Sequence, residues 1–239
     1  MKICVIGNSH VAAIKNAWDD VSSDHPSHEL YFFAAPGSHL RNLDLVDGYL
    51  APKTEGLAKK IAYTSGGNTH IDLNLFDAFI ICGLELEIPL LDIRLSKAVI
   101  NQTCQDIFSN SLNYKICNLI RKQSGKSIYI FHNPQLAPSD FDKELLNNKL
   151  LYPQVTKIMV ENLKIPNAFI SPQPIETLQN LWYTLPKFAI GSTRLLSNEQ
   201  HPELEIRHMN KDFGILWISK FLFKLKSNSQ ISNNLIDLF

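Results

Sequence analysis

The sequence predicts an α/β fold, a three-layer αβα sandwich built around a mostly parallel sheet. Short apolar runs rich in β-branched and aromatic residues recur along the chain, as expected of buried strands. Stretches with the apolar spacing of amphipathic helices separate these runs. The 239 residues contain no internal repeat, low-complexity segment or evident linker, so residues 1–239 are expected to form a single domain.

The expected strands follow from these runs in order. Residues 2–6 form a short apolar run that a Gly-Asn turn ends, and residues 29–34 form a second run that Pro36 and Gly37 end. Residues 77–83 have the strongest strand character, followed by Ser127–Phe131 and a short run at 167–170. Between the second and third strands, residues 38–74 suggest only a short hairpin near Ile61 and Ile71.

The expected helices lie between the strands. After the first strand, one helical face is formed by Val11, Ile14, Trp18 and Val21. A long helical region is predicted from about 93 to 122, and another over 141–163. Residues 171–207 carry several prolines and little periodicity. A final helix begins after Asn210, a good N-cap residue, with apolar residues from Phe213 to Phe221 on its inner face.

Composition excludes several classes of function. Lys+Arg and Asp+Glu number 23 each, so the net charge gives no reason to expect nucleic-acid or anionic-membrane binding. No apolar stretch is long enough to span a membrane, and the apolar run at the N-terminus is too short for a signal peptide, which predicts a cytoplasmic protein. The four cysteines form no Cys-x-x-Cys pair, so reduced, buried thiols are expected.

Ser9 is the first candidate for chemistry. In a parallel sheet ligands sit beyond the carboxyl ends of the strands, which places residues 7–10, 35–39, 83–87 and 132–135 around one site. Ser9 follows the first strand and begins the first helix, where backbone N–H groups favour a developing negative charge. Serine is also a common N-cap, so a purely structural role for Ser9 stays open.

His208 is the candidate base for Ser9. A serine hydroxyl needs a base to act as a nucleophile near neutral pH, and the base needs a carboxylate to orient it. Glu205 precedes His208 by three residues on a loop that enters the last helix, so both side chains can face the same cleft. Glu-x-x-His alone is a common coincidence, and the pairing with Ser9 gives it weight.

The motifs together resemble the SGNH/GDSL hydrolase family. Val5-Ile6-Gly7-Asn8-Ser9-His10 resembles the family's first block, usually Gly-Asp-Ser after the first strand, and Glu205-Ile206-Arg207-His208 resembles its last block, usually Asp-x-x-His. Gly37 and Gly83 match the glycines of the second and third blocks. The order, spacing and strand placement agree over nearly the whole chain.

The resemblance implies a serine esterase or acyltransferase that needs no cofactor or metal. Ser9 would attack an ester carbonyl, His208 would carry the proton, and Glu205 would orient His208. The N–H groups of Ser9 and Gly37 would form the oxyanion hole. Compact members of the family often act on acyl groups carried by sugars, which suggests an O-acylated, for example O-acetylated, carbohydrate as substrate. Acyl group, acceptor and oligomeric state are left open.

Three departures from the family pattern qualify this expectation. Asn8 and Glu205 each replace an aspartate, and both are conservative changes. The third block is usually Gly-x-Asn, whose amide donates to the oxyanion, whereas here Glu85 takes the place of the asparagine. A carboxylate there would oppose the oxyanion charge, so we expect Glu85 to point elsewhere, with Asn133 as a substitute donor.

Alternative readings remain for several residues. Ser38 in Gly37-Ser38-His39 mimics the first block, but no strand-to-helix turn is evident there. His25 and His28 lack a companion set of metal ligands, and His132 could line the pocket or be structural. Because Glu85 departs from the family pattern, a non-catalytic binding domain with the same fold is the alternative function.

Overall fold

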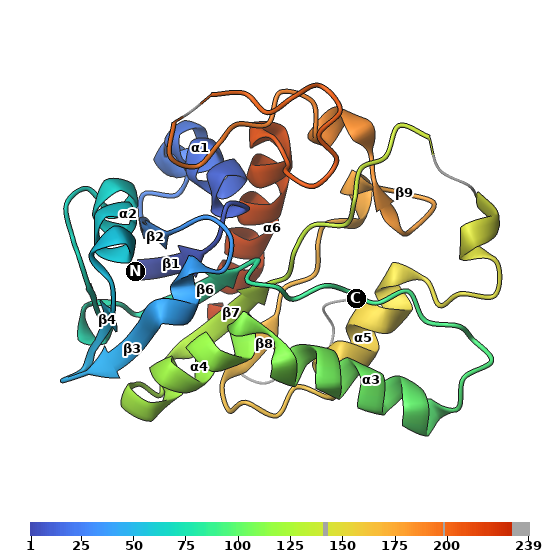
Figure 1. Ribbon diagram of the computed structural model, residues 1–239, viewed down its shortest axis with the longest axis horizontal. Coiled ribbons are helices and arrows are strands. Elements are labelled where there is room, and N and C mark those ends of the chain that lie inside the picture. Colours follow the sequence, from blue (N-terminus) through green and yellow to red (C-terminus); the bar gives the residue numbers. More distant parts are fainter. Residues whose placement is uncertain (141–142, 198, 231–239) are drawn as a thin grey trace.

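A five-stranded parallel sheet forms the centre of the protein (Figure 1). The structure is a computed structural model that describes residues 1–140, 143–197 and 199–230, without the side chains of 227–230. The strands lie in the order β2-β1-β6-β7-β8, an order typical of flavodoxin-like folds. Their bounds are β1 Lys2–Gly7, β2 Glu29–Ala34, β6 Ala78–Cys82, β7 Ser127–Phe131 and β8 Ala168–Ile170. The predicted α/β class and all five predicted strands are confirmed.

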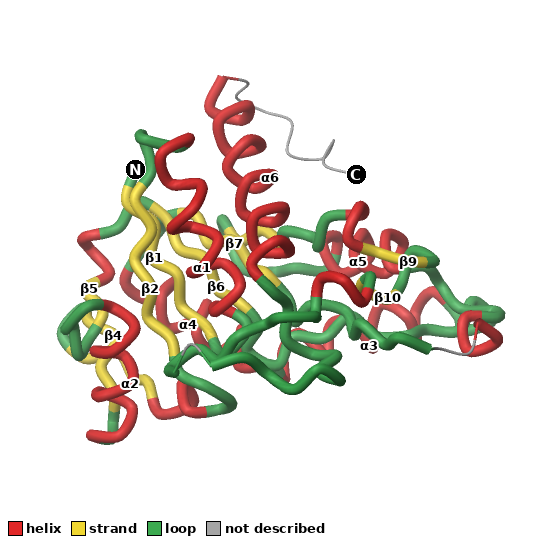
Figure 2. The backbone as a smooth tube through the Cα atoms, turned by 90° about the horizontal axis from the view of Figure 1, so that it is seen from above, coloured by secondary structure: helices red, strands yellow, loops and turns green. Residues whose placement is uncertain are grey.

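Helices cover both faces of this sheet. Alternate side chains of β1 enter different cores, because neighbouring residues of a strand point to opposite faces. Ile3 and Val5 pack with α1 (Val11–Val21) and α6 (Lys211–Gln230), whereas Cys4 and Ile6 belong to the core beneath the other helices. Those helices are α2 Glu55–Ser65, α3 Lys97–Asn110, α4 Leu112–Gln123 and α5 Tyr152–Glu161. In Figure 2 the strands run side by side, with α6 outside them.

Two small antiparallel sheets and several short helices accompany the central sheet. An antiparallel sheet joins β3 (Leu43–Val46), β4 (Tyr49–Pro52) and β5 (Ile71–Asp72), and a two-stranded one joins β9 (Leu178–Gln179) and β10 (Tyr183–Thr184). Short 3₁₀ helices lie at Ser22–Asp24, His39–Asn42, Leu73–Leu75, Lys143–Leu146, Ile175–Thr177 and Pro186–Phe188. All four cysteines are free and buried, as predicted. Among the described residues, no helix combines the length and apolarity that a membrane crossing requires.

Three sequence predictions of secondary structure were wrong. The expected hairpin near Ile61 and Ile71 is absent: Ile61 lies in α2, which Thr54 caps at its start, and Ile71 pairs with Leu50 of β4. The helical region 93–122 is two helices, because Ser111 adopts an extended conformation and caps α4 with its hydroxyl. Of the region 141–163, only Tyr152–Glu161 is α-helical, and 141–142 lie outside the described residues.

The contact between α1 and α6 is unusually close, and a glycine permits it. A Cβ atom placed on Gly214 of α6 would lie 2.1 Å from the carbonyl oxygen of Ala13 in α1 and 3.0 Å from the Cβ of Ala17. Real Cβ atoms do not approach backbone oxygens so closely, so any larger residue must push the helices apart. Asn210 caps α6 as predicted, its Oδ1 accepting from the N–H of Phe213 at 3.2 Å.

We therefore expect Gly214→Ala to destabilise the protein by about 1–3 kcal/mol, the usual cost of overpacking. The control is Gly56→Ala, because Gly56 lies in α2 with open space around its Cα. That substitution should stabilise by up to about 1 kcal/mol through helix propensity. Urea denaturation of the two variants checks both signs, and an unchanged Gly214→Ala midpoint would contradict the close-packing argument.

Candidate active site

The candidate site lies where the strand order changes direction. From β1 the chain runs first to β2 on one side and then to β6 on the other, so loops diverge at the carboxyl end of β1. Backbone hydrogen bonds tie these loops together: the N–H of Ala35 donates to Gly7 O at 3.1 Å, and that of Asn8 to Cys82 O at 3.3 Å. The N–H of Asn133 likewise donates to Leu86 O at 2.7 Å. Loops far apart in sequence thus meet at one edge of the sheet.

Ser9 lies in the tight turn between β1 and α1. The Asn8 side chain shapes this turn, because its Oδ1 accepts from the N–H of His10 at 3.2 Å. The carbonyl oxygen of Ser9 accepts from the N–H of Ala12, at 3.1 Å, at the start of the helix. The hydroxyl is turned toward His208, whose Nε2 lies 2.9 Å from Ser9 Oγ. The fold thus joins two residues 199 positions apart by one hydrogen bond.

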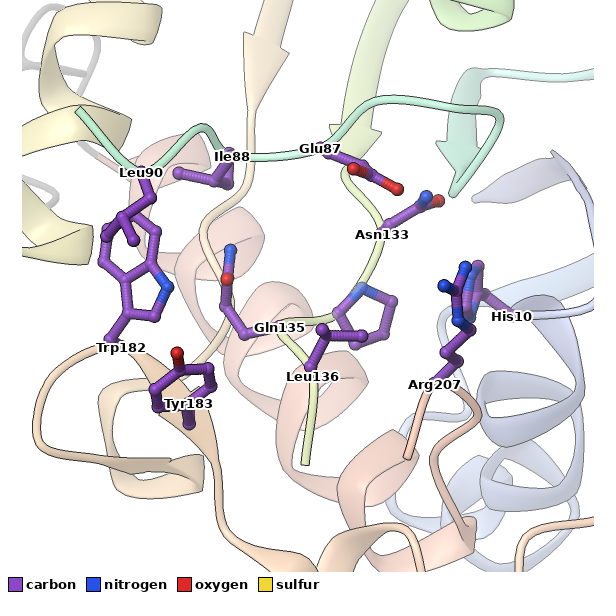
Figure 3. A pocket seen from close by; sticks show the side chains of 11 residues that line it. His10, Glu87, Ile88, Leu90, Asn133, Gln135, Leu136, Trp182, Tyr183 and Arg207 are labelled. Atoms are coloured by element: carbon purple, nitrogen blue, oxygen red, sulfur yellow. The ribbon is translucent and has the colours of Figure 1, made fainter. Parts of the chain in front are cut away.

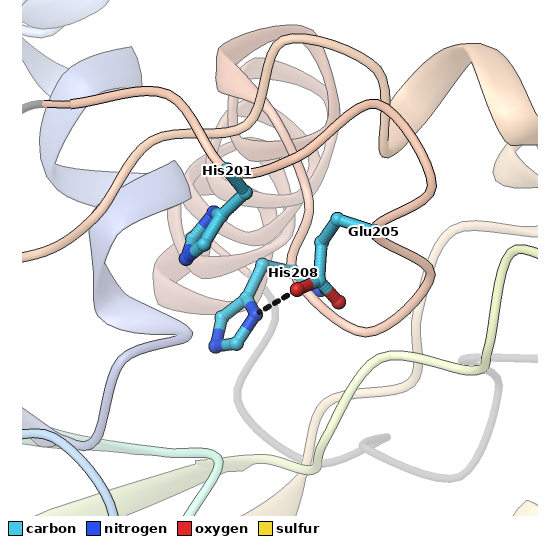
Figure 4. A group of neighbouring side chains, drawn as sticks. All are labelled: His201, Glu205 and His208. Carbon is cyan, nitrogen blue, oxygen red and sulfur yellow. Dashed lines mark hydrogen bonds and ion pairs between the residues drawn. The ribbon is translucent and has the colours of Figure 1, made fainter.

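Glu205 lies on the other side of the His208 ring (Figure 4). Its Oε2 is 3.2 Å from His208 Nδ1, a close polar contact at an angle too poor for a good hydrogen bond. Its Oε1 accepts from the N–H groups of Arg207 at 2.6 Å and His208 at 3.2 Å. Burial by itself would raise the pKa of Glu205, but these N–H groups and the His208 ring bring it below its ordinary value. The carboxylate therefore stays ionised beside the imidazole.

Two further histidines enclose the His208 ring. His201 stacks on it with ring centroids 4.3 Å apart and planes inclined by 16°, and His10 stacks at 5.3 Å and 28°. Burial, followed by the influence of His208, lowers the pKa of His10 to about 3 and also lowers that of His201. Both neighbours are therefore neutral near pH 7, and they fix the orientation of His208 without repelling its positive form.

His201, Glu205 and His208 also bring three ligand-type atoms within 4.8 Å of one another. The two imidazole rings are nearly parallel and stacked (Figure 4). The lone pairs of imidazole nitrogens lie in the ring planes, so stacked rings cannot direct both onto one ion. In this arrangement the contacts fit an oriented base better than a metal centre.

The backbone N–H groups of Ser9 and Gly37 are free to bind a ligand, since neither donates a hydrogen bond to any residue that the structure describes. The N–H of Gly83, by contrast, donates to Phe131 O at 2.7 Å. Gly83 has a positive φ of 75°, and a Cβ there would lie 2.3 Å from Asn8 Oδ1. Gly83 thus makes room for the Asn8 side chain, and its own N–H is not available to an oxyanion.

Glu85 belongs to a strained turn after β6. Three consecutive residues have positive φ, namely Gly83 at 75°, Leu84 at 54° and Glu85 at 67°. Buried Asn113 holds this turn: its N–H donates to Leu84 O at 3.2 Å and its amide donates to Gly83 O. The Glu85 carboxylate contacts Arg41 through both oxygens, with Arg41 Nε 3.2 Å from Oε1. Its charge is therefore balanced by a guanidinium.

A cavity of about 310 Å³ opens beside these residues (Figure 3). It is lined by His10, Glu87, Ile88, Leu90, Asn133, Pro134, Gln135, Leu136, Trp182, Tyr183 and Arg207. Two buried polar atoms, His10 Nδ1 and Asn133 Oδ1, have no hydrogen-bond partner among the described residues. Asn133, predicted as a donor to the oxyanion, thus lies on the cavity wall next to His10 (Figure 3).

His132 lies in a buried polar network. Its side chain is fully buried, with Nε2 2.8 Å from Tyr152 Oη, and Tyr152 Oη also accepts from the N–H of Gln173 at 2.5 Å. Gln173 in turn donates from its amide to Thr177 and Thr184 at 2.8 Å each. These contacts fix the loops that carry Asn133 and Trp182, so His132 has a structural role in positioning two residues of the cavity wall.

The other candidates are not joined to this group. Ser38 is exposed, and its hydroxyl makes no hydrogen bond with the residues that the structure describes. His39 contacts Lys60 instead. His25 packs against Trp18, and His28 is bonded to Ser27 at 3.0 Å. His10, which the sequence predicts to pack or cap at the first helical turn, packs on His208. Sequence reasoning missed His201 and Arg41, since loop residues of this kind carry no motif.

Comparison with known proteins gives little. No protein-family model and no curated protein matches the chain. Among solved structures, the crystal structure of a lipase from a goat rumen metagenome is similar with a TM-score of 0.43 and 11% sequence identity, over 93% of this chain and 96% of that chain. This likeness is too low to carry an argument, so the proposals below rest on the geometry of the site and on the sequence motifs.

The buried His132 predicts a pH-dependent stability. Burial lowers its pKa to about 4, whereas in an unfolded chain the pKa of histidine is about 6.5. Below about pH 6.5 His132 therefore binds a proton in the unfolded chain but stays neutral in the native state. The free energy of unfolding falls as the pH is lowered from there toward about 4. Between pH 8 and pH 5 this group should cost about 2 kcal/mol.

Urea denaturation at pH 8 and pH 5 measures this loss, and His132→Gln should reduce the difference between the two pH values. His70→Gln, which removes an exposed imidazole, is the control. An equal pH effect in wild type and His132→Gln would show that His132 takes no part.

Proposed function

We propose that the protein is a serine-dependent ester hydrolase of the SGNH type, with acyl transfer as the second outcome of the same chemistry. The observation that supports this most strongly is the series Ser9 Oγ–His208 Nε2 at 2.9 Å and His208 Nδ1–Glu205 Oε2 at 3.2 Å. Nucleophile, base and orienting carboxylate within contact distance are what acyl transfer by serine requires. A serine that served only as an N-cap would not need a histidine at its hydroxyl.

The proposed reaction has two halves. Ser9 Oγ attacks the ester carbonyl while His208 Nε2 takes the hydroxyl proton, and the resulting tetrahedral intermediate collapses as His208 returns that proton to the leaving alcohol. Water then attacks the acyl-serine with His208 again as base, releasing a carboxylic acid and free Ser9. Where an acceptor alcohol replaces water, the product is a new ester. Glu205 keeps the proton of His208 on Nδ1 and stabilises the imidazolium.

The oxyanion of the intermediate needs donors. We assign this role to the N–H groups of Ser9 and Gly37, which are unpaired among the described residues and lie on neighbouring loops at the ends of β1 and β2. Asn133 is the proposed third donor, in place of the asparagine that Glu85 replaces. This assignment needs the Asn133 amide to turn toward the substrate, and the lack of a partner for its Oδ1 leaves the side chain free to do so.

The proposed substrate is an O-acylated carbohydrate, for example an O-acetylated sugar. The resemblance of the motifs to the SGNH/GDSL family is the first support. The second is the polar character of one end of the cavity, where Glu87, Asn133 and Gln135 offer hydrogen-bonding groups of the kind that bind hydroxyls. The mechanism requires no cofactor or metal.

Ser9→Ala should abolish hydrolysis of p-nitrophenyl acetate and labelling by a fluorophosphonate, because both reactions form a bond to Ser9 Oγ. The label, with fluoride as its leaving group, should be found by peptide mapping on the peptide that contains Ser9. His208→Ala should lower kcat/KM by about a thousandfold or more, since base and nucleophile act as a unit.

Ser38→Ala is the matched control, because it removes an exposed serine that also stands between a glycine and a histidine, in Gly37-Ser38-His39. It should retain both activity and labelling. Labelling on Ser38, or full activity of Ser9→Ala, would refute the assignment. Thermal unfolding of each variant separates loss of the nucleophile from loss of the fold.

The second candidate function is a binding domain that keeps the fold without catalysis, and Glu85 in place of the family's asparagine favours it. A carboxylate facing the oxyanion would destabilise the intermediate. Its contact with Arg41 argues against this orientation, because the guanidinium both neutralises the carboxylate and holds it. Side chains of this pair are 56% and 35% exposed, so the contact contributes little to stability.

We therefore expect Glu85→Asn to change kcat/KM by less than about tenfold, whereas a repulsive Glu85 would give a gain of about a hundredfold when replaced. Stability should change by less than about 1 kcal/mol, because asparagine tolerates positive φ and so offsets the lost ion pair.

Arg41→Gln tests the same point from the other partner. Freed from Arg41, the Glu85 carboxylate can turn toward the intermediate, so kcat/KM should fall, and adding Glu85→Asn should restore it. If Arg41→Gln has no effect and Glu85→Asn raises the rate a hundredfold, the natural protein is a weak enzyme or a binder.

A further inference from the structure

The cavity of about 310 Å³ is joined to the proposed catalytic residues through the chain itself. His10 follows Ser9, and Arg207 precedes His208, and both line the same end of the cavity (Figure 3). Ser9 and His208 do not line the cavity themselves, but a molecule that fills this space contacts the residue next to each of them, and His10 also stacks on the His208 ring. On the side away from His10 and Arg207, the cavity is lined by Leu90 and Trp182 (Figure 3).

Two charged groups on the cavity wall have no partner within the described part of the chain. The Arg207 guanidinium makes no hydrogen bond or ion pair there, and neither does the Glu87 carboxylate. By contrast, Arg41 and Arg94 are each paired with a carboxylate. Glu87 and Arg207 are both exposed residues, so a ligand can reach their charges, and the buried Asn133 Oδ1 on the same wall has no partner; such groups suit a polar ligand.

The charge of the wall restricts that ligand. Burial keeps His10 neutral, since its pKa is about 3, so Arg207 is the positive group on the wall and Glu87 the negative one. A guanidinium binds planar carboxylates through two parallel hydrogen bonds. Glu87 repels any anionic ligand, and it repels a doubly charged phosphate more strongly than a singly charged carboxylate, which Arg207 alone can balance. The Glu87 carboxylate can accept hydrogen bonds from hydroxyls, which sugars supply.

We propose that the cavity binds an acylated sugar that carries a carboxylate, with Arg207 pairing with the carboxylate and Glu87 and Asn133 with hydroxyls. This inference rests on the proposed function for the chemistry at the ester, and it adds the charge of the substrate. Arg207 then sets specificity, because a carboxylate makes a charge-assisted pair with the guanidinium that a neutral sugar does not make.

The first experiment compares two substrates that differ in one group, acetylated methyl glucuronoside and acetylated methyl glucoside, at pH 7. Wild type should have a kcat/KM about tenfold or more higher for the acid, the discrimination that a charge-assisted hydrogen bond typically gives. Arg207→Gln should bring the ratio of the two values close to one. Arg194→Gln, which removes an exposed positive charge from the same segment, should leave the ratio as in wild type.

The second experiment measures binding without catalysis. In Ser9→Ala, calorimetry with methyl glucuronoside, methyl glucoside and glucose 6-phosphate should give the tightest binding for the glucuronoside, and adding Arg207→Gln should remove that preference. Circular dichroism checks the fold of each variant. Equal affinity for the glucuronoside and the glucoside, or tighter binding of the phosphate, would overturn the assignment of a carboxylate.

The two experiments separate the two proposals. Charge-dependent binding without hydrolysis of any ester would support the proposed carboxylate site and refute the proposed hydrolase activity. If wild type and Arg207→Gln both hydrolyse the acid and the neutral ester with equal kcat/KM, the hydrolase activity is supported and the carboxylate site is refuted.

Discussion

The close packing of α1 against α6 is the contact on which the candidate site depends. Ser9 lies in the turn that enters α1, and His208 lies on the loop that enters α6. The distance between the two helices therefore sets the distance between the two side chains, and Gly214 allows that distance to be short. Two residues that are 199 positions apart stay within 2.9 Å only if the elements that carry them are held rigidly. The packing of this helix pair against the sheet holds them. Core packing thus determines the geometry of the chemistry.

A second set of backbone constraints determines what else reaches the site. Asn8 and Gly83 interlock at the carboxyl ends of β1 and β6, because the absent side chain of Gly83 leaves room for the Asn8 amide. The left-handed turn that begins at Gly83 then carries Glu85 toward Arg41. Strain in this turn is offset by Asn113, which binds two of its carbonyl groups. The departure from the family pattern at Glu85 is therefore built into a supported turn.

The sequence predicted the elements whose signal is local. The five strands are short runs of buried apolar residues, and Asn210, as a good N-cap residue, indicates where the last helix begins. Ser9 and His208 could be paired from the sequence because each lies within a recognisable motif. The helix α2 was missed because few apolar residues mark its inner face, essentially Leu57 and Ile61. Arg41 meets Glu85 from a distant part of the sequence, so no local pattern predicts that contact. His201 and Trp182 lie in the region 171–207, which supplies part of the cavity wall and has no periodicity from which its structure could be predicted.

The electrostatics of the site follow from burial and pairing together. The histidines beside His208 are kept neutral by burial, and Glu205 is kept ionised by the N–H groups of the loop that carries it. The His208 ring therefore lies beside one ionised carboxylate and two neutral imidazoles. Arg41 balances Glu85 on the far side of the strained turn. What remains on the cavity wall, within the described residues, is a single cation and a single anion held apart, Arg207 and Glu87. A chain with no net charge can thus present a locally charged surface, because pairing elsewhere removes the competing fields. Under the proposed function, recognition at this site depends on the ligand that pairs with those two groups, and catalysis depends on the closely packed Ser9, His208 and Glu205 behind them.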